Sequence, residues 1–403
     1  MGHRRHSAAG FTVIEMVVAL FVMAVVLVGM LALFDASNRI ARTQVHVADM
    51  QQSLRIGHDE MVRMARIAAR GWVINNTSWK PEDQIKLAVD NAGPAVYIGT
   101  ATDPEYKVLP GTDVLRIRGV IVGSLFENEI GQENSCAQNA SPDPLQKGGC
   151  SIEPDDLLIK AISRSGLKQD LDQLERAMDD GNGNVTVLLV SKQGEVATTD
   201  AEITDVDKTG NTITSASIHA DPTIASSSWV DDLEKHPIAL TGIVEEYAFY
   251  IRENDGKPRL AMARFKPGTD EPYGGNAHPE NLRQDIADDI IDLQVALGVD
   301  KYTDTNGDGF IDALDHGDGV IAADEWFYAG VAGAGALPDF GTKGDLQLVR
   351  ISTLARTQGR DFQYVSKPIV NIENHTYNET TVDPVARSYR RRVLQTVLNL
   401  RNM

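Results

Sequence analysis

Glu15 is the residue whose type and position most directly indicate chemistry. It is the one ionisable side chain in the apolar segment 11–34. A carboxylate in hydrocarbon costs several kcal/mol unless it has a partner, so an acid there is a functional residue by default. Cleavage after Gly10 would create such a partner, the new amine of Phe11. That amine lies one helical turn from Glu15, or comes from a neighbouring subunit of a polymer. Glu15 therefore predicts a charge-paired contact, either within one helix or between neighbouring subunits of a polymer.

A second group of residues has the spacing of a calcium loop. Segment 304–315 places side-chain oxygens at the loop positions that an EF-hand uses, and Gly309 stands where the sharp turn is needed. Asp315 replaces the usual glutamate at the end of the loop. Hard oxygen ligands suit calcium. The expected ligands are Asp304, Asn306, Asp308, Asp312, Asp315 and the backbone carbonyl of Phe310.

We predict that calcium at this loop is structural and orders residues 300–326. The alternative is a solvated acidic turn built from good turn formers. A poorer set of acids follows at Asp318, Asp324 and Glu325. Because this set lacks a complete early half, the sequence leaves a second calcium site open.

The two cysteines, Cys136 and Cys150, bracket a loop rich in Asn, Pro and Gly. A disulfide between them would close a loop of about 15 residues and, in the chain-entropy model, stabilise the fold by about 3 kcal/mol. The bond is favoured only if this part of the chain lies outside the cytoplasm.

The sequence does not indicate catalysis. No HExxH, GxSxG or P-loop motif occurs, and no GxGxxG follows a predicted strand. The net charge of −19 argues against a nucleic-acid partner. We therefore predict a protein that is not an enzyme and does not bind nucleic acid.

The segment that carries Glu15 is long enough to cross a bilayer, which takes about 20 apolar residues. Residues 1–10 before it are polar and contain Arg4 and Arg5, and positive flanks stay in the cytoplasm. The pattern predicts a leader at 1–10, a transmembrane helix at 11–34 and everything after Asp35 outside the cytoplasm. A cleaved secretory signal is the alternative, but its apolar region is usually only about 7–15 residues long.

Beyond the span, one stripe of apolar or small residues recurs with helical spacing. Its members are Val47, Met50, Leu54, Gly57, Met61, Met64 and Ala68. The stripe predicts an amphipathic continuation of the helix over 35–70, and Gly71 is the residue at which we expect the helix to end. A headpiece must cover this stripe.

Residues 72–403 have the pattern of short strands between turn signals. This predicts an α+β fold in which the helix covers an antiparallel β-sheet headpiece. Asn254-Asp255-Gly256 predicts a hairpin turn. Irregular segments are expected at about 127–154 and 266–281, the first of them inside an insert of about 127–182. The predicted strands are 113–122, 185–192, 213–219, 243–252, 260–265, 293–297, 346–353 and 393–400.

Gly10-Phe11-Thr12-Val13-Ile14-Glu15, followed by the apolar run, resembles the class III signal of type IV prepilins and pseudopilins. Further segments resemble the PilW-like minor pilins: 111–115, 250–260, 286–300 and 388–402. The resemblance implies a type IV pilin-like fold, cleavage between Gly10 and Phe11 by a prepilin peptidase and N-methylation of Phe11. It also implies a role for Glu15 in recruiting the subunit into the filament.

The resemblance further implies a single-pass inner-membrane protein that reaches the pilus or cell surface after assembly. Its partners would be other minor and major pilins, the prepilin peptidase, the inner-membrane assembly platform and membrane lipid. The implied role is initiation, assembly or tip formation of a type IV pilus. Two alternatives stay open: a minor pseudopilin of type II secretion, and a filament-borne adhesin or calcium-dependent surface-binding module.

Overall fold

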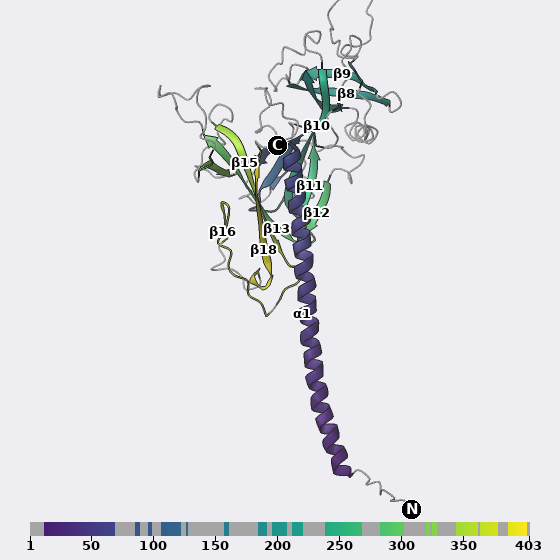
Figure 1. Ribbon diagram of the computed structural model, residues 1–403, viewed down its shortest axis with the longest axis vertical. Helices are drawn as coiled ribbons and strands as arrows, with labels where there is room; N and C mark the ends of the chain where they lie inside the picture. Colours follow the sequence, from purple (N-terminus) through teal and green to yellow (C-terminus); the bar gives the residue numbers. More distant parts are fainter. Residues whose placement is uncertain are drawn as a thin grey trace, which may run out of the picture.

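The computed structural model contains one long helix with a β-rich headpiece around its upper part (Figure 1). This is the α+β architecture that the sequence predicts. The structure describes residues 12–68, 85–88, 96–98, 106–121, 126–127, 157–160, 184–191, 196–207, 212–220, 238–267, 283–301, 320–322, 325–328, 344–361, 363–377 and 386–400.

Helix α1 (Val13–Ala68) is 56 residues long, which at 1.5 Å per residue gives a rod of about 84 Å. It contains no proline, and a helix satisfies every backbone hydrogen bond of an apolar segment internally. Only the upper part of α1 contacts the headpiece (Figure 1). The predicted continuous helix is confirmed for residues 13–68, whereas Gly71 lies outside the described residues.

The larger sheet has ten strands, and its described pairings are antiparallel. Its centre is the long strand β10 (Ile238–Asn254), which pairs with β7 near its start and with β4 and β11 further along. The strand order is β1-β4-β10-β7-β8-β9-β6, with β11 between β10 and β12 and β5 on β10. The other strands are β1 (Ile85–Ala88), β4 (Val114–Gly119), β5 (Phe126–Glu127), β6 (Leu157–Lys160), β7 (Asn184–Ser191), β8 (Val196–Asp207), β9 (Thr212–Ala220), β11 (Lys257–Phe265) and β12 (Arg283–Asp288).

A second sheet has four strands in the order β14-β13-β15-β18, again antiparallel. Two small hairpins, β2–β3 and β16–β17, and the short 3₁₀ helix η5 complete the described elements. The bounds are β13 (Ile290–Lys301), β14 (Trp326–Tyr328), β15 (Gly344–Arg356), β18 (Arg391–Asn399), β2 (Val96–Tyr97), β3 (Lys107–Val108), β16 (Asn371–Ile372), β17 (His375–Thr376) and η5 (Ala386–Ser388).

Asp289 separates the two sheets. The sequence predicts one sheet. In the structure, β12 ends just before Asp289 and pairs with β11 of the large sheet, whereas β13 begins just after Asp289 and pairs with β15 of the second sheet. Asp289 has a φ of 59°, a left-handed conformation that aspartate tolerates better than most residues. Its backbone N–H donates to Pro258 O at 2.9 Å and its carbonyl accepts from Arg356 N at 3.0 Å. The corner therefore belongs to both sheets.

The core lies where α1 covers both sheets. Met50, Leu54, Met61 and Met64 are at most 5% exposed and belong to one cluster with side chains of β4, β10, β13 and β15. Alternation along β10 places Tyr247, Phe249 and Ile251 in this cluster and Ala248 and Tyr250 in a second one, because successive residues of a strand point to opposite faces. The described side chains of the stripe on α1 therefore belong to the core, as the spacing predicts.

Each predicted strand overlaps an observed one. The hairpin turn is also confirmed, because Asp255 and Gly256 have φ values of 52° and 72° between β10 and β11. Strand β6, which lies within the predicted insert of about 127–182 but after its irregular segment, pairs with β9. The sequence analysis did not predict β8, β12 or the shorter strands β1, β2, β3, β5, β6, β14, β16 and β17.

Candidate functional site

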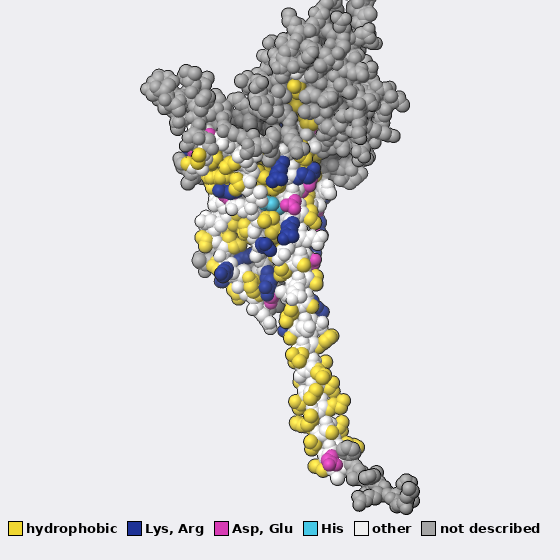
Figure 2. All heavy atoms as spheres, in the orientation of Figure 1, with side chains coloured by type: hydrophobic (Ala, Val, Ile, Leu, Met, Phe, Trp, Pro, Cys, Tyr) yellow, Lys and Arg dark blue, Asp and Glu magenta, His cyan; other side chains and the backbone are white. Residues whose placement is uncertain are grey.

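The lower part of α1 is an uncovered apolar surface. Its large hydrophobic side chains from Val13 to Phe34 are 48–82% exposed, and they cover the stalk below the headpiece (Figure 2). Among the described residues, α1 is the one helix long and apolar enough to cross a membrane. From Val13 to Phe34 the helix rises about 33 Å, close to the ~30 Å thickness of a bilayer's hydrocarbon core.

Glu15 lies at the lower tip of this surface. Its Oε2 accepts hydrogen bonds from the backbone N–H and the hydroxyl of Thr12, both at 2.9 Å, and the N–H of Glu15 lies 3.4 Å from Thr12 Oγ1. This reciprocal arrangement is a capping box, with Thr12 before the helix and Glu15 in its first turn. Gly10 and Phe11 lie outside the described residues, so the pairing of Glu15 with the Phe11 amine stays a prediction.

His58 fixes the upper part of α1 to the four-stranded sheet. Its Nδ1 lies 2.9 Å from Thr353 Oγ1 on β15, and its Nε2 lies 2.7 Å from Thr396 Oγ1 on β18. The side chain is 2% exposed, and burial lowers the pKa of His58 below its ordinary value. The sequence analysis missed this residue, although His58 follows Leu54 by one helical turn and therefore lies on the buried stripe.

Gly57 lets α1 approach the large sheet closely. A β-carbon at this position would lie 2.7 Å from Leu260 Cδ2 on β11 and 3.1 Å from Ala287 Cβ on β12. Real β-carbons essentially never have a contact below 3.0 Å, so a side chain at this position would require Leu260 to move. Gly57 and His58 thus hold α1 to one sheet each.

Buried ion pairs tie the outer hairpin to the four-stranded sheet. On β15, the Nε–H of Arg350 lies 2.9 Å from both carboxylate oxygens of Glu373, and its Nη2 donates to Oε2 at 2.5 Å; the Glu373 side chain is 2% exposed. Beside them, His375 Nδ1 lies 3.2 Å from Asp292 Oδ2, and the ring of His375 stacks on Tyr377. These contacts position β16–β17 over β13 and β15, and the sequence analysis predicted none of them.

The predicted calcium ligands of 304–315 lie outside the described residues. Of the poorer set, only Glu325 is described, and its Oε1 and Oε2 accept from the backbone N–H groups of Lys301 and Ala322 at 3.1 and 2.7 Å. Glu325 thus joins the end of β13 to the chain before β14. The described part of the chain contains no cluster of acids, histidines or cysteines arranged to hold a metal. Cys136 and Cys150 also lie outside it.

Two family models match the chain. Residues 5–31 match the prokaryotic N-terminal methylation motif, and residues 248–402 match the type IV pilus-assembly protein W family. The second match covers the C-terminal part of β10 and every described element from β11 to β18.

Among solved structures, a type IV-like pilin from Thermus thermophilus shares 9% identity with the chain. The match covers 58% of this chain and 97% of the pilin, with a TM-score of 0.18, which is too low to indicate a common arrangement of the whole fold. No curated protein matches the chain.

Proposed function

We propose that this chain, which is a PilW-like type IV pilin, enters the pilus as a minor subunit through the exposed lower part of α1 and presents its headpiece at one end of the filament. The observation that carries this proposal is the uncovered apolar helix with a single carboxylate, Glu15, near its tip. Its family membership agrees with a structural role and not a catalytic one.

Processing after Gly10 would change the surroundings of Glu15. The motif at residues 5–31 is that of chains methylated at the amino terminus, and we infer cleavage between Gly10 and Phe11 by a prepilin peptidase. The new amine then competes with Thr12 for the carboxylate of Glu15. When a neighbouring subunit supplies that amine, the two opposite charges pair with each other inside the apolar helix bundle. A charge stays buried at low cost only when it has such a partner.

The expected topology places residues 1–10 in the cytoplasm and the headpiece on the other side of the inner membrane. Arg4 and Arg5 lie directly before the apolar segment, and such positive flanks stay in the cytoplasm. The assembly platform in the same membrane and the other major and minor pilins are the partners that this position makes available.

The size of the headpiece favours a place at the filament end. Residues 72–403 in a compact body would have a radius of gyration of about 20 Å, whereas packed helices lie about 8–10 Å apart. Headpieces of this size crowd one another least when the subunit is used in few copies, at initiation or at the tip.

Glu15→Val tests the assembly role in a deletion strain complemented with each variant. We expect the variant to reach the membrane at the normal level but to be absent from sheared filaments, with surface pili reduced at least about tenfold, because an unpaired amine would be left in the apolar bundle. Asp35→Asn, which alters an exposed acid just above the span, is the matched control and should assemble normally.

The same strains separate the alternatives. Wild-type incorporation of the Glu15→Val chain would contradict the proposal. Loss of protein secretion with intact pili would indicate a type II secretion pseudopilin. Intact pili with lost surface attachment would indicate an adhesin.

We also propose calcium as a structural ion of segment 304–315. Supporting it are the ligand spacing and the place of the segment directly after β13, whose end Glu325 joins to the chain before β14. In isothermal titration of the full-length protein in detergent, we expect one calcium ion bound with a Kd of about 10⁻⁴–10⁻³ M. Asp308→Ala should remove that binding and the thermal stabilisation by calcium, whereas Asp345→Ala should not. Equal calcium uptake by the Asp308→Ala chain would refute the site.

A further inference from the structure

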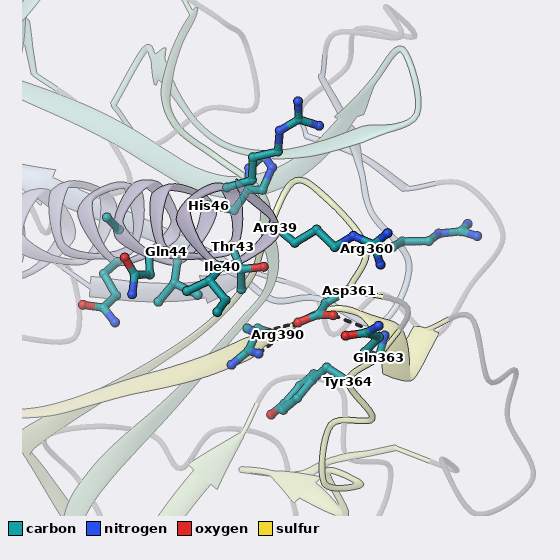
Figure 3. A pocket seen from close by; sticks show the side chains of 14 residues that line it. Arg39, Ile40, Thr43, Gln44, His46, Arg360, Asp361, Gln363, Tyr364 and Arg390 are labelled. Atoms are coloured by element: carbon teal, nitrogen blue, oxygen red, sulfur yellow. Dashed lines mark hydrogen bonds and ion pairs between the residues drawn. The ribbon is translucent and has the colours of Figure 1, made fainter. Parts of the chain in front are cut away.

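A groove lies between α1 and residues 360–361 and 363–364, just above the apolar part of the helix. Its volume is about 990 Å³. Helix residues Arg39, Thr43 and His46 line one side, and loop residues Arg360, Asp361 and Tyr364 line the other (Figure 3). Residue Arg390, which precedes β18, completes it.

The groove is basic in a strongly acidic chain. Arg39, Arg42, Arg360 and Arg390 line it against one acid, Asp361, which gives a formal charge of four minus one, +3 with His46 neutral, whereas the whole chain carries −19. Figure 2 shows dark-blue side chains where the stalk enters the headpiece. A local concentration of arginine against the overall charge indicates an anionic partner.

The four arginines differ in how strongly they are already engaged. Arg390 pairs with Asp361 at 2.9 Å and Arg39 with Asp35 at 2.6 Å, but the side chains of the second pair are 65% and 61% exposed, and exposed pairs are weak. Arg42 is exposed and has no acidic partner within the described part of the chain. Arg360 donates from its Nε to Tyr389 at 3.1 Å, which leaves its terminal nitrogens as donors.

The wall of the groove is a fixed part of the fold. Asp361 N donates to Ser388 O and Thr357 N donates to Arg390 O, both at 2.8 Å. A β-carbon on Gly359 would lie 3.1 Å from His46 Nε2, so the loop lies directly against α1. The groove therefore exists without a ligand.

The lower end of the groove lies within reach of the headgroup layer of a bilayer. If the hydrocarbon ends near Phe34, Arg39 lies about 7 Å and Arg42 about 12 Å further along the axis. A headgroup layer extends about 5–8 Å beyond the hydrocarbon on each side. Helix side chains tilt toward the N-terminus, so both arginines reach toward the membrane. Ile40, which is 60% exposed beside them, offers an apolar contact for the lipid's glycerol and upper acyl chain.

We propose that this groove binds the phosphate headgroup of an anionic phospholipid in the leaflet that faces the headpiece. The arginines contact the phosphate, and the lipid fixes the height of the headpiece above the membrane before the subunit is extracted into a filament. The inference rests on the membrane span in α1 and is independent of the position in the filament.

The test is native mass spectrometry of the full-length protein released from nanodiscs that contain equal amounts of phosphatidylglycerol and phosphatidylcholine. We expect the wild-type chain to retain phosphatidylglycerol at least about tenfold over phosphatidylcholine. Arg42→Gln/Arg360→Gln should lower that ratio at least about fivefold. The matched control, Arg55→Gln/Arg66→Gln, removes two exposed arginines from the same helix, about 20 Å or more further from the membrane, and should keep the ratio.

Equal retention of the two lipids by the wild-type chain, or an unchanged ratio in Arg42→Gln/Arg360→Gln, would overturn the proposal. So would displacement of the lipid by millimolar inorganic phosphate, which would indicate a site for a free anion. If Arg42→Gln/Arg360→Gln loses cross-linking to another pilin while the lipid ratio stays the same, the groove binds an acidic protein surface instead. Each variant should keep the wild-type melting temperature, which excludes unfolding as the cause.

Discussion

His58 makes the attachment of α1 to the headpiece sensitive to pH. Because burial lowers its pKa below the ordinary value of 6.5, the unfolded chain binds a proton here at a higher pH than the folded chain does. The free energy of unfolding therefore rises with pH through this window and falls as pH drops below about 6.5. A charged imidazole would also disturb the hydrogen bonds to Thr353 and Thr396, which are worth about 1 kcal/mol each.

We expect the full-length protein in detergent to lose on the order of 1 kcal/mol of stability between pH 7.5 and 5.5 from this residue. Thermal unfolding of His58→Gln should show a smaller loss across the same range, because the amide keeps hydrogen-bonding capacity but does not titrate. Gln52→Ala, at an exposed position of the same helix, serves as control and should retain the wild-type slope. An identical slope in His58→Gln would contradict the assignment.

At the scale of elements, the contact of α1 with β11 and β12 depends on the missing side chain of Gly57. Gly57→Val would place atoms against Leu260 and Ala287, where even a β-carbon is too close. We expect a loss of about 1–3 kcal/mol, typical of overpacking, measured by chemical denaturation. Gly29→Ala is the control, because a β-carbon there has nothing within 4 Å, and it should not destabilise the headpiece. Equal stability of Gly57→Val and wild type would show that the helix is not held closely to this sheet.

Local patterns predicted the elements whose signal lies in their own residues. The spacing of Met50, Leu54, Met61 and Met64 indicated the buried face of α1, and the turn at Asp255 indicated the β10–β11 hairpin. Strand β12 was missed because its sequence, RQDIAD, is polar. Its Asp285 is satisfied by Arg252 and Arg259 on other strands, at 2.6 and 2.9 Å. Such a partnership depends on strand register, which local patterns do not contain.

The same limit explains what the sequence missed of the candidate site. Glu15 was found because a carboxylate in an apolar run is conspicuous by itself. The sequence analysis did not identify His58 or the basic groove, because they are formed together with Thr396, Arg360 and Arg390. These three residues are distant from α1 in sequence, and the second sheet brings them to the helix. The division into two sheets at Asp289 likewise follows from tertiary hydrogen bonds to Pro258 and Arg356.

At the scale of the whole molecule, the chain is an apolar rod that carries a headpiece held to its upper part (Figure 1). In our proposal the rod serves both as membrane anchor and as surface for polymerisation, because the same exposed apolar side chains can contact lipid or neighbouring helices. We propose that the change from one to the other depends on a positive partner for Glu15, which would arise when the leader is removed.

The most direct test of this account is the amino terminus of the mature protein, read by mass spectrometry after extraction from the membrane of the native host. The account predicts a chain that begins at Phe11 with one added methyl group on its amine, and an unprocessed chain in a strain without prepilin peptidase. A mature protein that keeps Met1, or one that begins well beyond Phe11, would contradict it, since Glu15 would then lack the amine or the helix would lack Glu15.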